Sequence, residues 1–184
     1  MEKSNSVFIA TSLDGQIADK DGGIEWLDSI PGINTIDTGY EAFMSRIDAM
    51  IMGRKTFQKV LSFGIDWPYA KPVYVLSNSL AKVPEKLSGK AHLVKGSLED
   101  VLKDLHESGH LRLYVDGGST IRSFLAKDCI DEMIITRIPI LVGDGVPLFG
   151  NIPVSLKFEL VESKVYLGQI VQDHYKRSAK VEKR

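Results

Sequence analysis

Apolar residues occur along the chain in short runs separated by polar, glycine-containing stretches. Short runs rich in Val, Ile, Leu, Met and Tyr predict strands. At residues 49–52 every position is apolar, which is typical of a strand covered on both faces of a sheet. The strands predicted in this way span residues 7–11, 49–52, 73–76, 91–94, 111–115 and 133–138.

Helical spacing of apolar residues follows several of these strands. It is clearest at residues 98–107, where leucines and a valine recur at i, i+3, i+4 and i+7 and so share one face. Ser97 is a suitable N-cap for this helix, and Gly109 lies just beyond its end. Further helices are predicted at residues 40–47, 55–61 and 119–126.

The C-terminal part departs from this alternation of strands and helices. Residues 158–163 and 170–175 alternate apolar and polar positions around Gly168, which predicts an antiparallel pair. We therefore expect an α/β fold with a mostly parallel central sheet, an antiparallel C-terminal edge and flanking helices. Residues 1–175 are expected to form a single domain, and residues 176–184 a basic, polar tail in solvent. In such a sheet the strand-to-helix turns share one edge, where ligands bind.

Composition excludes several functions. The 184 residues include 23 Lys and Arg against 24 Asp and Glu, and the formal net charge of -1 gives no reason to expect nucleic acid or a membrane as partner. Cys129 is the only cysteine, and the four histidines lack metal-ligand spacing, so no metal is expected. No apolar run suits a membrane span and the N-terminus does not resemble a signal peptide, so the expected compartment is the cytoplasm.

Two turns have the features of phosphate-binding sites, because each follows a predicted strand with glycine and begins a helix. The turn at residues 53–56 adds two cations and a threonine to its glycine, and the turn at residues 117–120 has two glycines before its hydroxyl residues. Neither turn matches GxGxxG or GxxxxGK(S/T), which disfavours an ordinary Rossmann dehydrogenase and a P-loop enzyme. Two such turns in one domain favour a dinucleotide as the ligand, because a dinucleotide needs phosphate-binding groups at several places.

Five segments, in the same order, resemble the dihydrofolate reductase family and in particular its branch with the reductase domain of riboflavin-biosynthesis enzymes. The segments are ATSLDGQIA (10–18), MGRKTF (52–57), VLSNS (75–79), VDGGSTI (115–121) and ITRIPILVGDGVPLF (135–149). The resemblance implies an NADPH-dependent oxidoreductase that transfers hydride to a small heterocycle. The implied substrate is the riboflavin-pathway aminouracil, 5-amino-6-(5-phosphoribosylamino)uracil, or a pterin, and the implied assembly is a homodimer.

The resemblance also assigns cofactor-binding residues position by position. Residues matching Ala10, Thr11 and Ile17 lie along the nicotinamide, and the loop around Asp14 and Gly15 closes over it. The pyrophosphate and the 2′-phosphate are bound by the residues matching Gly53, Arg54, Lys55, Thr56, Ser77, Asn78, Gly117, Gly118, Ser119 and Thr120.

The proton that reduction requires can come from a carboxyl group whose pKa is raised by burial in a partly apolar pocket. The candidates are Asp37 and Glu41, before and on the helix that precedes Gly53. Asp37 matches the carboxylate of dihydrofolate reductase in its spacing from the MGR turn, whereas Glu41 lies on the helix itself. Both have a simpler explanation, because Asp37 can cap the helix and Glu41 can face water.

Two other functions stay open. Lys71 stands where dihydrofolate reductase has an arginine for the folate carboxylate, so a true dihydrofolate reductase would lack that bidentate contact. The riboflavin-type substrate instead needs a cation for its phosphate, for which Arg46 and Lys71 are candidates. A protein that binds NADP(H) without catalysis is the alternative from a different class, and a carboxyl group facing the nicotinamide would favour the enzyme.

Overall fold

An eight-stranded sheet forms the centre of the computed structural model, which describes residues 2–150, 152–153 and 155–178. The strand order is β5-β4-β3-β6-β1-β7-β10-β9, and the first six strands in this order are parallel to their neighbours. β10 pairs antiparallel with β7 and with β9, so the predicted antiparallel C-terminal edge is confirmed. The strands are β1 Ser4–Thr11, β3 Ala49–Gly53, β4 Val73–Leu76, β5 Ala91–Val94, β6 Arg112–Asp116, β7 Glu132–Arg137, β9 Phe158–Tyr166 and β10 Ile170–Arg177.

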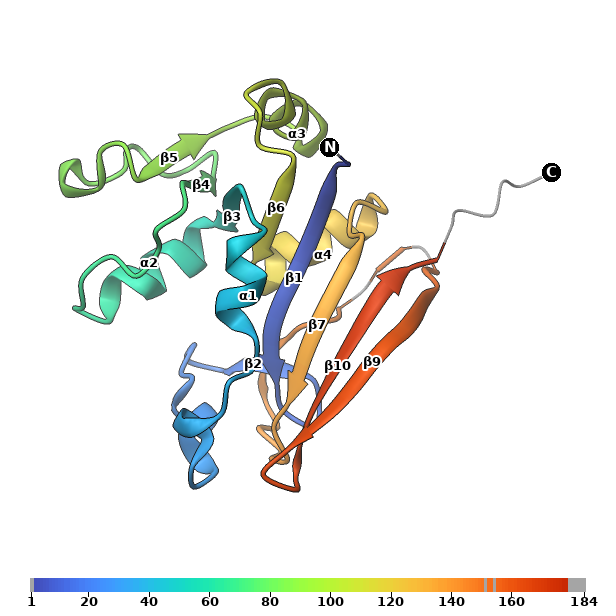
Figure 1. The fold of residues 1–184 in the computed structure, drawn as a ribbon. Helices are drawn as coiled ribbons and strands as arrows, with labels where there is room; N and C mark the ends of the chain where they lie inside the picture. The colour runs from blue at the N-terminus through green and yellow to red at the C-terminus, as the bar shows by residue number, and fades with distance from the viewer. Residues whose placement is uncertain (1, 151, 154, 179–184) are drawn as a thin grey trace.

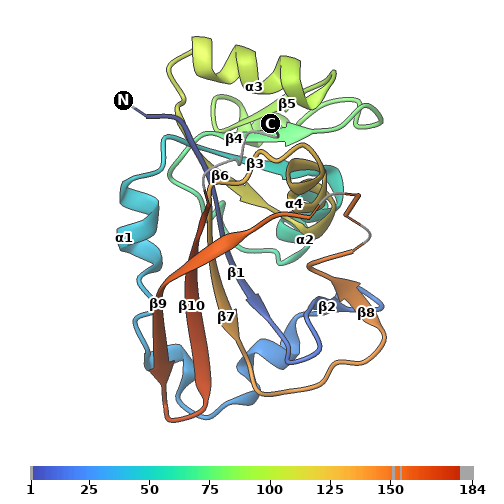
Figure 2. The same cartoon turned by 90° about the vertical axis from the view of Figure 1, so that its right-hand side faces the viewer.

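Helices cover both faces of the sheet, and α1 and α4 lie on opposite sides of it (Figures 1 and 2). Phe43 of α1 and Phe57 of α2 pack in one apolar cluster with the β3 and β4 side chains of that face. Val101 of α3 and Phe124 of α4 belong to a second cluster on the other face. The helices are α1 Tyr40–Ser45, α2 Arg54–Ser62, α3 Leu98–Glu107 and α4 Gly118–Ala126, with short 3-10 turns η1 Glu25–Ser29, η2 Ile33–Thr35 and η3 Glu85–Leu87.

Local sequence signals explain where several elements begin and end. The hydroxyl of Ser97 accepts a hydrogen bond from the Asp100 N–H at 3.2 Å, so the predicted N-cap of α3 is confirmed. The β9–β10 turn places Leu167 and Gly168 at positive φ (51° and 68°), the conformation that favours a glycine in a tight hairpin. The first helix ends earlier than predicted, at Ser45.

Two further differences from the sequence prediction concern a short ribbon and the end of the last strand. A separate two-stranded ribbon, β2 (Gln16–Asp19) with β8 (Gly145–Pro147), was not predicted, because both segments are short and without a clear alternation. β10 continues to Arg177, whose guanidinium binds Asp128 at 2.7 Å, so residues 176 and 177 belong to the sheet rather than to the expected tail. Residues 179–184 of that tail lie outside the described residues.

Candidate active site

The parallel strands bring the predicted cofactor-binding segments to one edge of the sheet. β4, β3, β6 and β1 are neighbours and all run in the same direction, so their carboxyl ends lie side by side. Residues 77–78 follow β4, residues 53–56 follow β3, residues 117–120 follow β6, and residues 10–11 end β1. The topology therefore places four segments from distant parts of the chain along a continuous edge.

The two glycine-containing turns on this edge pack directly against each other. Gly117 has a φ of 89°, and a Cβ added to it would overlap the Thr56 hydroxyl. A Cβ on Gly53 would lie 2.9 Å from Thr120 Oγ1, closer than ordinary contact allows. Each threonine thus occupies the space that the glycine of the other turn leaves free. Glycine is required at both positions for this approach, which makes the two turns one backbone surface.

The helices that begin at these turns have unsatisfied N-termini. Unlike α3, neither α2 nor α4 has a side-chain cap in the described structure, so the N–H groups of their first turns are available to an anion. Arg54 and Lys55 add two positive charges at the start of α2, and neither is in an ion pair within the described part of the chain. Arg54 hydrogen-bonds Gln58 at 3.1 Å. This donor set fits the phosphates of a dinucleotide.

The β2–β8 ribbon lies against the start of α4. A Cβ on Gly118 would be 2.9 Å from Ile17 Cδ1, and Arg122 of α4 donates to the Pro147 carbonyl. The predicted residues Ile17 and Gly118 are therefore close in space, although a hundred residues separate them in the sequence.

The loop of residues 12–15, between β1 and β2, is held by a carboxylate. Asp14 accepts a hydrogen bond from the Ser12 hydroxyl and from the N–H groups of Val142 (3.1 Å) and Gly143 (2.7 Å). The Ser12 hydrogen bond and these backbone donors lower the pKa of Asp14 to about 2. Asp14 thereby joins the loop that the resemblance places over the nicotinamide to the loop that precedes β8.

The other predicted cofactor-binding residues differ in how far they are exposed and in what they contact. Ser77 is buried, and its hydroxyl accepts from the N–H of Leu80 at 3.0 Å, so it stabilises the turn after β4, while Asn78 is exposed. Ser119 is exposed at the start of α4. Ala10 and Thr11, as successive residues of β1, point to opposite faces of the sheet.

The predicted catalytic carboxyl groups do not lie in apolar surroundings. Asp37 and Glu41 are both exposed, and Asp37 accepts a hydrogen bond from the Gly39 N–H at 2.8 Å in the turn before α1. Their catalytic role stays a prediction. Arg46, a candidate for the substrate phosphate, instead forms an ion pair with the buried Glu132 at 2.6 Å.

A different carboxyl group has the property that the prediction required. Asp116 is the last residue of β6 and directly precedes Gly117. Its Oδ1 accepts a hydrogen bond from the Gly117 N–H at 2.8 Å. Burial raises the pKa of Asp116 to about 6, and the Gly117 hydrogen bond offsets only part of that effect. Asp116 is therefore partly protonated near neutral pH. The sequence feature that could have pointed to Asp116 is its position at the end of a predicted strand, within VDGG. That segment by itself indicates only a turn.

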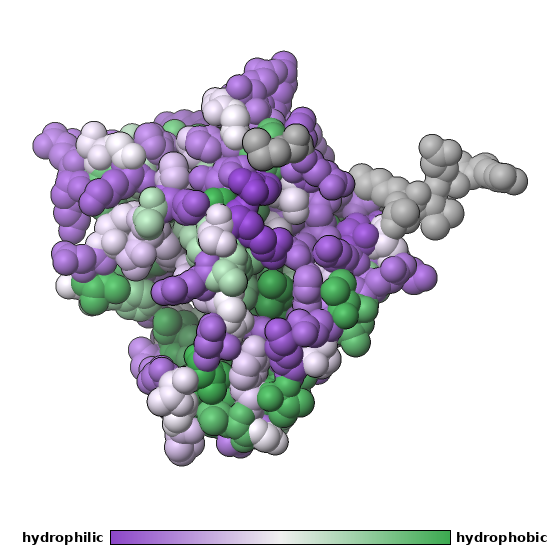
Figure 3. Space-filling model, viewed as in Figure 1, coloured by the Kyte–Doolittle hydropathy of each residue, from purple (hydrophilic) through white to green (hydrophobic). Residues whose placement is uncertain are grey.

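Three tyrosines lie near enough to Asp116 for its charge to affect them. Burial, and next the negative charge of Asp116, raise the pKa values of Tyr40, Tyr69 and Tyr114. The Tyr114 hydroxyl donates to the Phe8 carbonyl at 2.8 Å. The alternation along β6 puts Asp116 on the same face as Tyr114, which is the face that carries α1 and α2. Figure 3 views the molecule from the α1 side, where hydrophilic residues separate groups of hydrophobic ones.

The sheet order, the crossovers and the position of the turns define an α/β protein with a dihydrofolate reductase-like fold. A bifunctional diaminohydroxyphosphoribosylaminopyrimidine deaminase/5-amino-6-(5-phosphoribosylamino)uracil reductase from Thermotoga maritima has the same fold, with a TM-score of 0.72 and 17% identity. The alignment covers 96% of this chain and 57% of that one.

The model of the RibD C-terminal domain matches residues 6–172. The uncharacterized Bacillus subtilis protein YwjB is 35% identical over 181 residues, which is 97% of this chain and all of that protein. A Shewanella sp. PV-4 protein named for riboflavin biosynthesis is 54% identical with a TM-score of 0.91, over 95% of this chain and 99% of that one. The chain belongs to the RibD C-terminal domain family.

Two kinds of feature do not occur among the described residues. None of their helices is long and apolar enough to cross a membrane. No group of three or more His, Cys, Asp or Glu side chains within them is placed to hold a metal ion.

Proposed function

We propose that the protein is an NADPH-dependent reductase of a small heterocycle, of the phosphoribosylaminouracil or pterin type. The observation that carries the proposal is the shared edge. It brings together the N-termini of α2 and α4, the cations Arg54 and Lys55, which form no ion pair among the described residues, and a partly protonated carboxyl group. Membership of the RibD C-terminal domain family supports the class of reaction.

Different residues of this edge would bind different parts of the cofactor. The first turns of α2 and α4 would hold the pyrophosphate through their N–H donors, while Thr56 and Thr120 pack the two turns together. Arg54 and Lys55 supply the additional positive charge that a 2′-phosphate requires. When bound, NADPH supplies the reducing equivalent. Ile17 and the loop that Asp14 holds would close over the nicotinamide, as the resemblance implies.

Asp116 is the group that we assign to proton supply. Its carboxyl group is protonated in a substantial fraction of molecules near pH 6, so it can donate to a substrate atom on the α1 side of the sheet. The Gly117 N–H fixes one carboxyl oxygen, Oδ1, which leaves Oδ2 for the substrate. Asp37 and Glu41 remain the competing assignments.

Steady-state turnover with three matched variants tests these assignments. NADPH oxidation is followed with the aminouracil substrate and with dihydrofolate, for the wild type, Asp116→Asn, Asp37→Asn and Glu41→Gln. We expect Asp116→Asn to lower kcat on the order of 100-fold, the usual size of a general-acid contribution, with NADPH affinity unchanged. A loss confined to Asp37→Asn or Glu41→Gln would transfer the role to that residue.

The choice of substrate in the same assay separates the alternatives. Turnover of dihydrofolate alone would identify a dihydrofolate reductase that functions with Lys71 in place of arginine. NADPH binding without turnover of either compound would favour a non-catalytic NADP(H)-binding protein. Turnover of the aminouracil is the result that the proposal predicts.

A further inference from the structure

Two of the six tyrosine hydroxyls of the chain have no hydrogen-bond partner among the residues that the structure describes. They are those of Tyr40, at the start of α1, and Tyr69, in the loop between α2 and β4. The other four each form a hydrogen bond with another described residue, at 2.8–3.3 Å: Tyr74, Tyr114, Tyr166 and Tyr175. Because a partly buried tyrosine hydroxyl usually has a partner, these two donors are available to a ligand.

The strand register places Asp116 in the same region as the two hydroxyls. In the parallel pairing of β3 with β6, Met50 is opposite Tyr114 and Met52 is opposite Asp116. Met50, Met52 and Tyr114 all belong to the apolar cluster on the α1 side of the sheet. Alternation along β6 therefore puts the Asp116 side chain over that cluster, at the carboxyl end of the strand.

Aromatic rings approach this position from two sides. From the α1 side, Tyr40 contacts Phe8 of β1 edge to face, with the ring centroids 5.4 Å apart. From the α2 side, Trp67 contacts Phe57 and Tyr69, with centroids 5.8 and 5.2 Å away. All of these rings except that of Tyr40 are assigned to the same apolar cluster. Aromatic and apolar side chains with a few polar groups among them are typical of a site for a flat, small molecule.

The two hydroxyls lie near the Asp116 carboxyl group and near each other. Burial, and then the negative charge of Asp116, raises the pKa of Tyr40 and of Tyr69, and Tyr40 adds to the effect on Tyr69. Both phenols therefore stay protonated at neutral pH, so both can donate. Asp116 and Tyr69 are half-buried and Tyr40 is 37% exposed, so none of the three groups is closed off from solvent.

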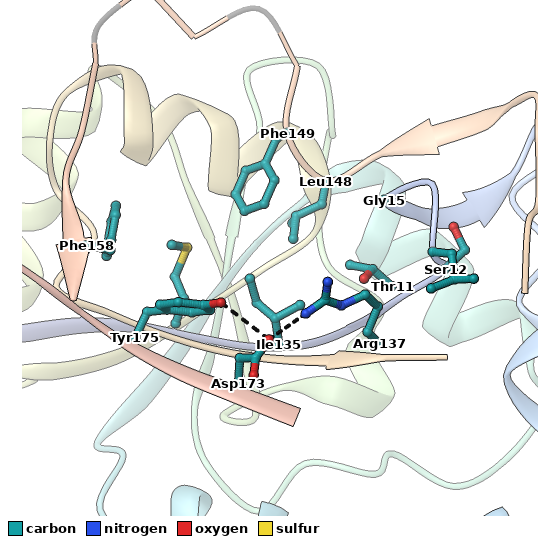
Figure 4. A pocket seen from close by; sticks show the side chains of 12 residues that line it. Thr11, Ser12, Gly15, Ile135, Arg137, Leu148, Phe149, Phe158, Asp173 and Tyr175 are labelled. Carbon is teal, nitrogen blue, oxygen red and sulfur yellow. Dashed lines mark hydrogen bonds and ion pairs between the residues drawn. The ribbon is translucent and has the colours of Figure 1, made fainter. Parts of the chain in front are cut away.

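A second carboxyl and phenol pair, on the opposite face of the sheet, has no such free groups. Tyr175 and Asp173 line a cavity of about 340 Å³ there (Figure 4). The Tyr175 hydroxyl donates to Asp173 at 3.3 Å, and Asp173 also accepts from Ser163 and from the Arg137 guanidinium. These side chains are paired with one another, whereas the hydroxyls beside Asp116 are not.

We propose that Tyr40 and Tyr69 are substrate-binding residues, each donating a hydrogen bond to an acceptor of the heterocycle while Asp116 contacts the atom that is protonated. The inference rests on the proposed function, which supplies the class of ligand. Both the aminouracil and the pterin type are flat lactams, with a ring carbonyl oxygen and further acceptors around the ring. Two neutral phenol donors fit such acceptors without adding a charge.

Replacement by phenylalanine separates this role from a structural one. Tyr40→Phe and Tyr69→Phe keep the ring contacts with Phe8 and Trp67 and remove only the hydroxyls. Since neither hydroxyl bonds to a described residue, we expect urea unfolding to give the same free energy for both variants as for the wild type. A structural role would instead lower that free energy and leave ligand affinity unchanged.

Fluorescence titration with lumazine (pteridine-2,4-dione), which contains the uracil ring within a pteridine, tests the proposal. We expect each variant to bind lumazine about 3- to 10-fold more weakly than the wild type, the usual effect of one hydrogen bond between neutral groups. Tyr74→Phe is the matched control, since Tyr74 packs on the other face and its hydroxyl bonds His110, and it should bind as the wild type does. A wild type that does not bind lumazine, or variants that bind it equally well, would overturn the inference. Weakening in one variant alone would overturn the role of the other tyrosine.

The titration needs neither NADPH nor turnover, so its result is separate from that of the reductase assay. Lumazine binding that depends on the two hydroxyls, without reduction of any heterocycle, would leave the binding residues in place and contradict the reductase. Reduction of the aminouracil without this dependence would do the reverse. In an active enzyme, Tyr40→Phe and Tyr69→Phe should raise KM for the heterocycle by the same factor with kcat little changed, because the hydrogen bonds form before the transition state.

Discussion

Replacing Asp116 by asparagine separates the energetic cost of the partly buried carboxylate from its proposed chemical role. The pKa of this group rises from 3.8 to about 6 on folding, because burial disfavours the charged form. Each pH unit corresponds to about 1.4 kcal/mol, so ionised Asp116 destabilises the fold by up to about 3 kcal/mol at pH 8. The Asn side-chain oxygen can still accept from the Gly117 N–H, so that hydrogen bond is retained.

The sign of the pH dependence follows from the direction of the shift. The folded state binds the proton more tightly than the unfolded state, so the cost is absent below about pH 4 and grows as the pH rises toward 6. Asp116→Asn should therefore stabilise the protein by up to about 3 kcal/mol at pH 8 and by about 1.5 kcal/mol at pH 5. The same variant is the one expected to lose turnover, which is typical of a catalytic group held at an energetic cost.

Urea unfolding followed by tryptophan fluorescence at pH 5 and pH 8 measures both values. Asp66→Asn, a change of the same kind at an exposed loop position, is the control and should leave the free energy of unfolding unchanged at both pH values. A gain that is equal at pH 5 and pH 8, or no gain at pH 8, would refute the argument from burial.

Three further changes test other parts of the structure. Asp48→Ala removes the acceptor of the Arg112 guanidinium (2.6 Å) and of two backbone N–H groups, so urea unfolding at pH 7 should show a loss of about 1–3 kcal/mol; a loss below about 0.5 kcal/mol would contradict it. The Arg112 hydrogen bond lowers the pKa of Asp48 to about 2, so this stabilisation is present above about pH 4 and should be lost as the pH falls toward 2. Asp14→Ala should accelerate amide exchange at residues 142–143 and weaken NADPH binding, and unchanged exchange would show that the carboxylate does not hold the loop. Gly117→Ala should lower the Tm more than Gly89→Ala, because both glycines have positive φ but only Gly117 faces an occupied space; equal losses would leave strain as the whole effect.

Features set by neighbouring residues were predictable from the sequence. The apolar run of β3, the cap of α3 and the glycine in the β9–β10 turn each depend on interactions within a few residues. The parallel arrangement of the strands also follows from the alternation with helices, and it places the segments around Gly53 and Gly117 on the same edge. The order of residues along the chain is therefore sufficient to predict this part of the candidate site.

Features that depend on contacts between distant residues were not predictable. The raised pKa of Asp116 arises from burial in the folded chain, where its charge also acts on Tyr40 and Tyr69, so no local pattern marks it. Arg46 looked like a free cation, but the buried Glu132 of β7 binds it. The β2–β8 ribbon likewise joins segments that are more than a hundred residues apart. In each case the fold, rather than the residue type, decides whether a charged group is available.

Calorimetric titration of the purified chain with NADPH and with NADH tests the shared phosphate-binding edge most directly. The account predicts that NADPH binds with one site per chain and more tightly than NADH, and that Arg54→Ala removes most of this preference. If neither dinucleotide binds, the helix N-termini at this edge do not form a cofactor site, and the assignment of the protein as a reductase is contradicted.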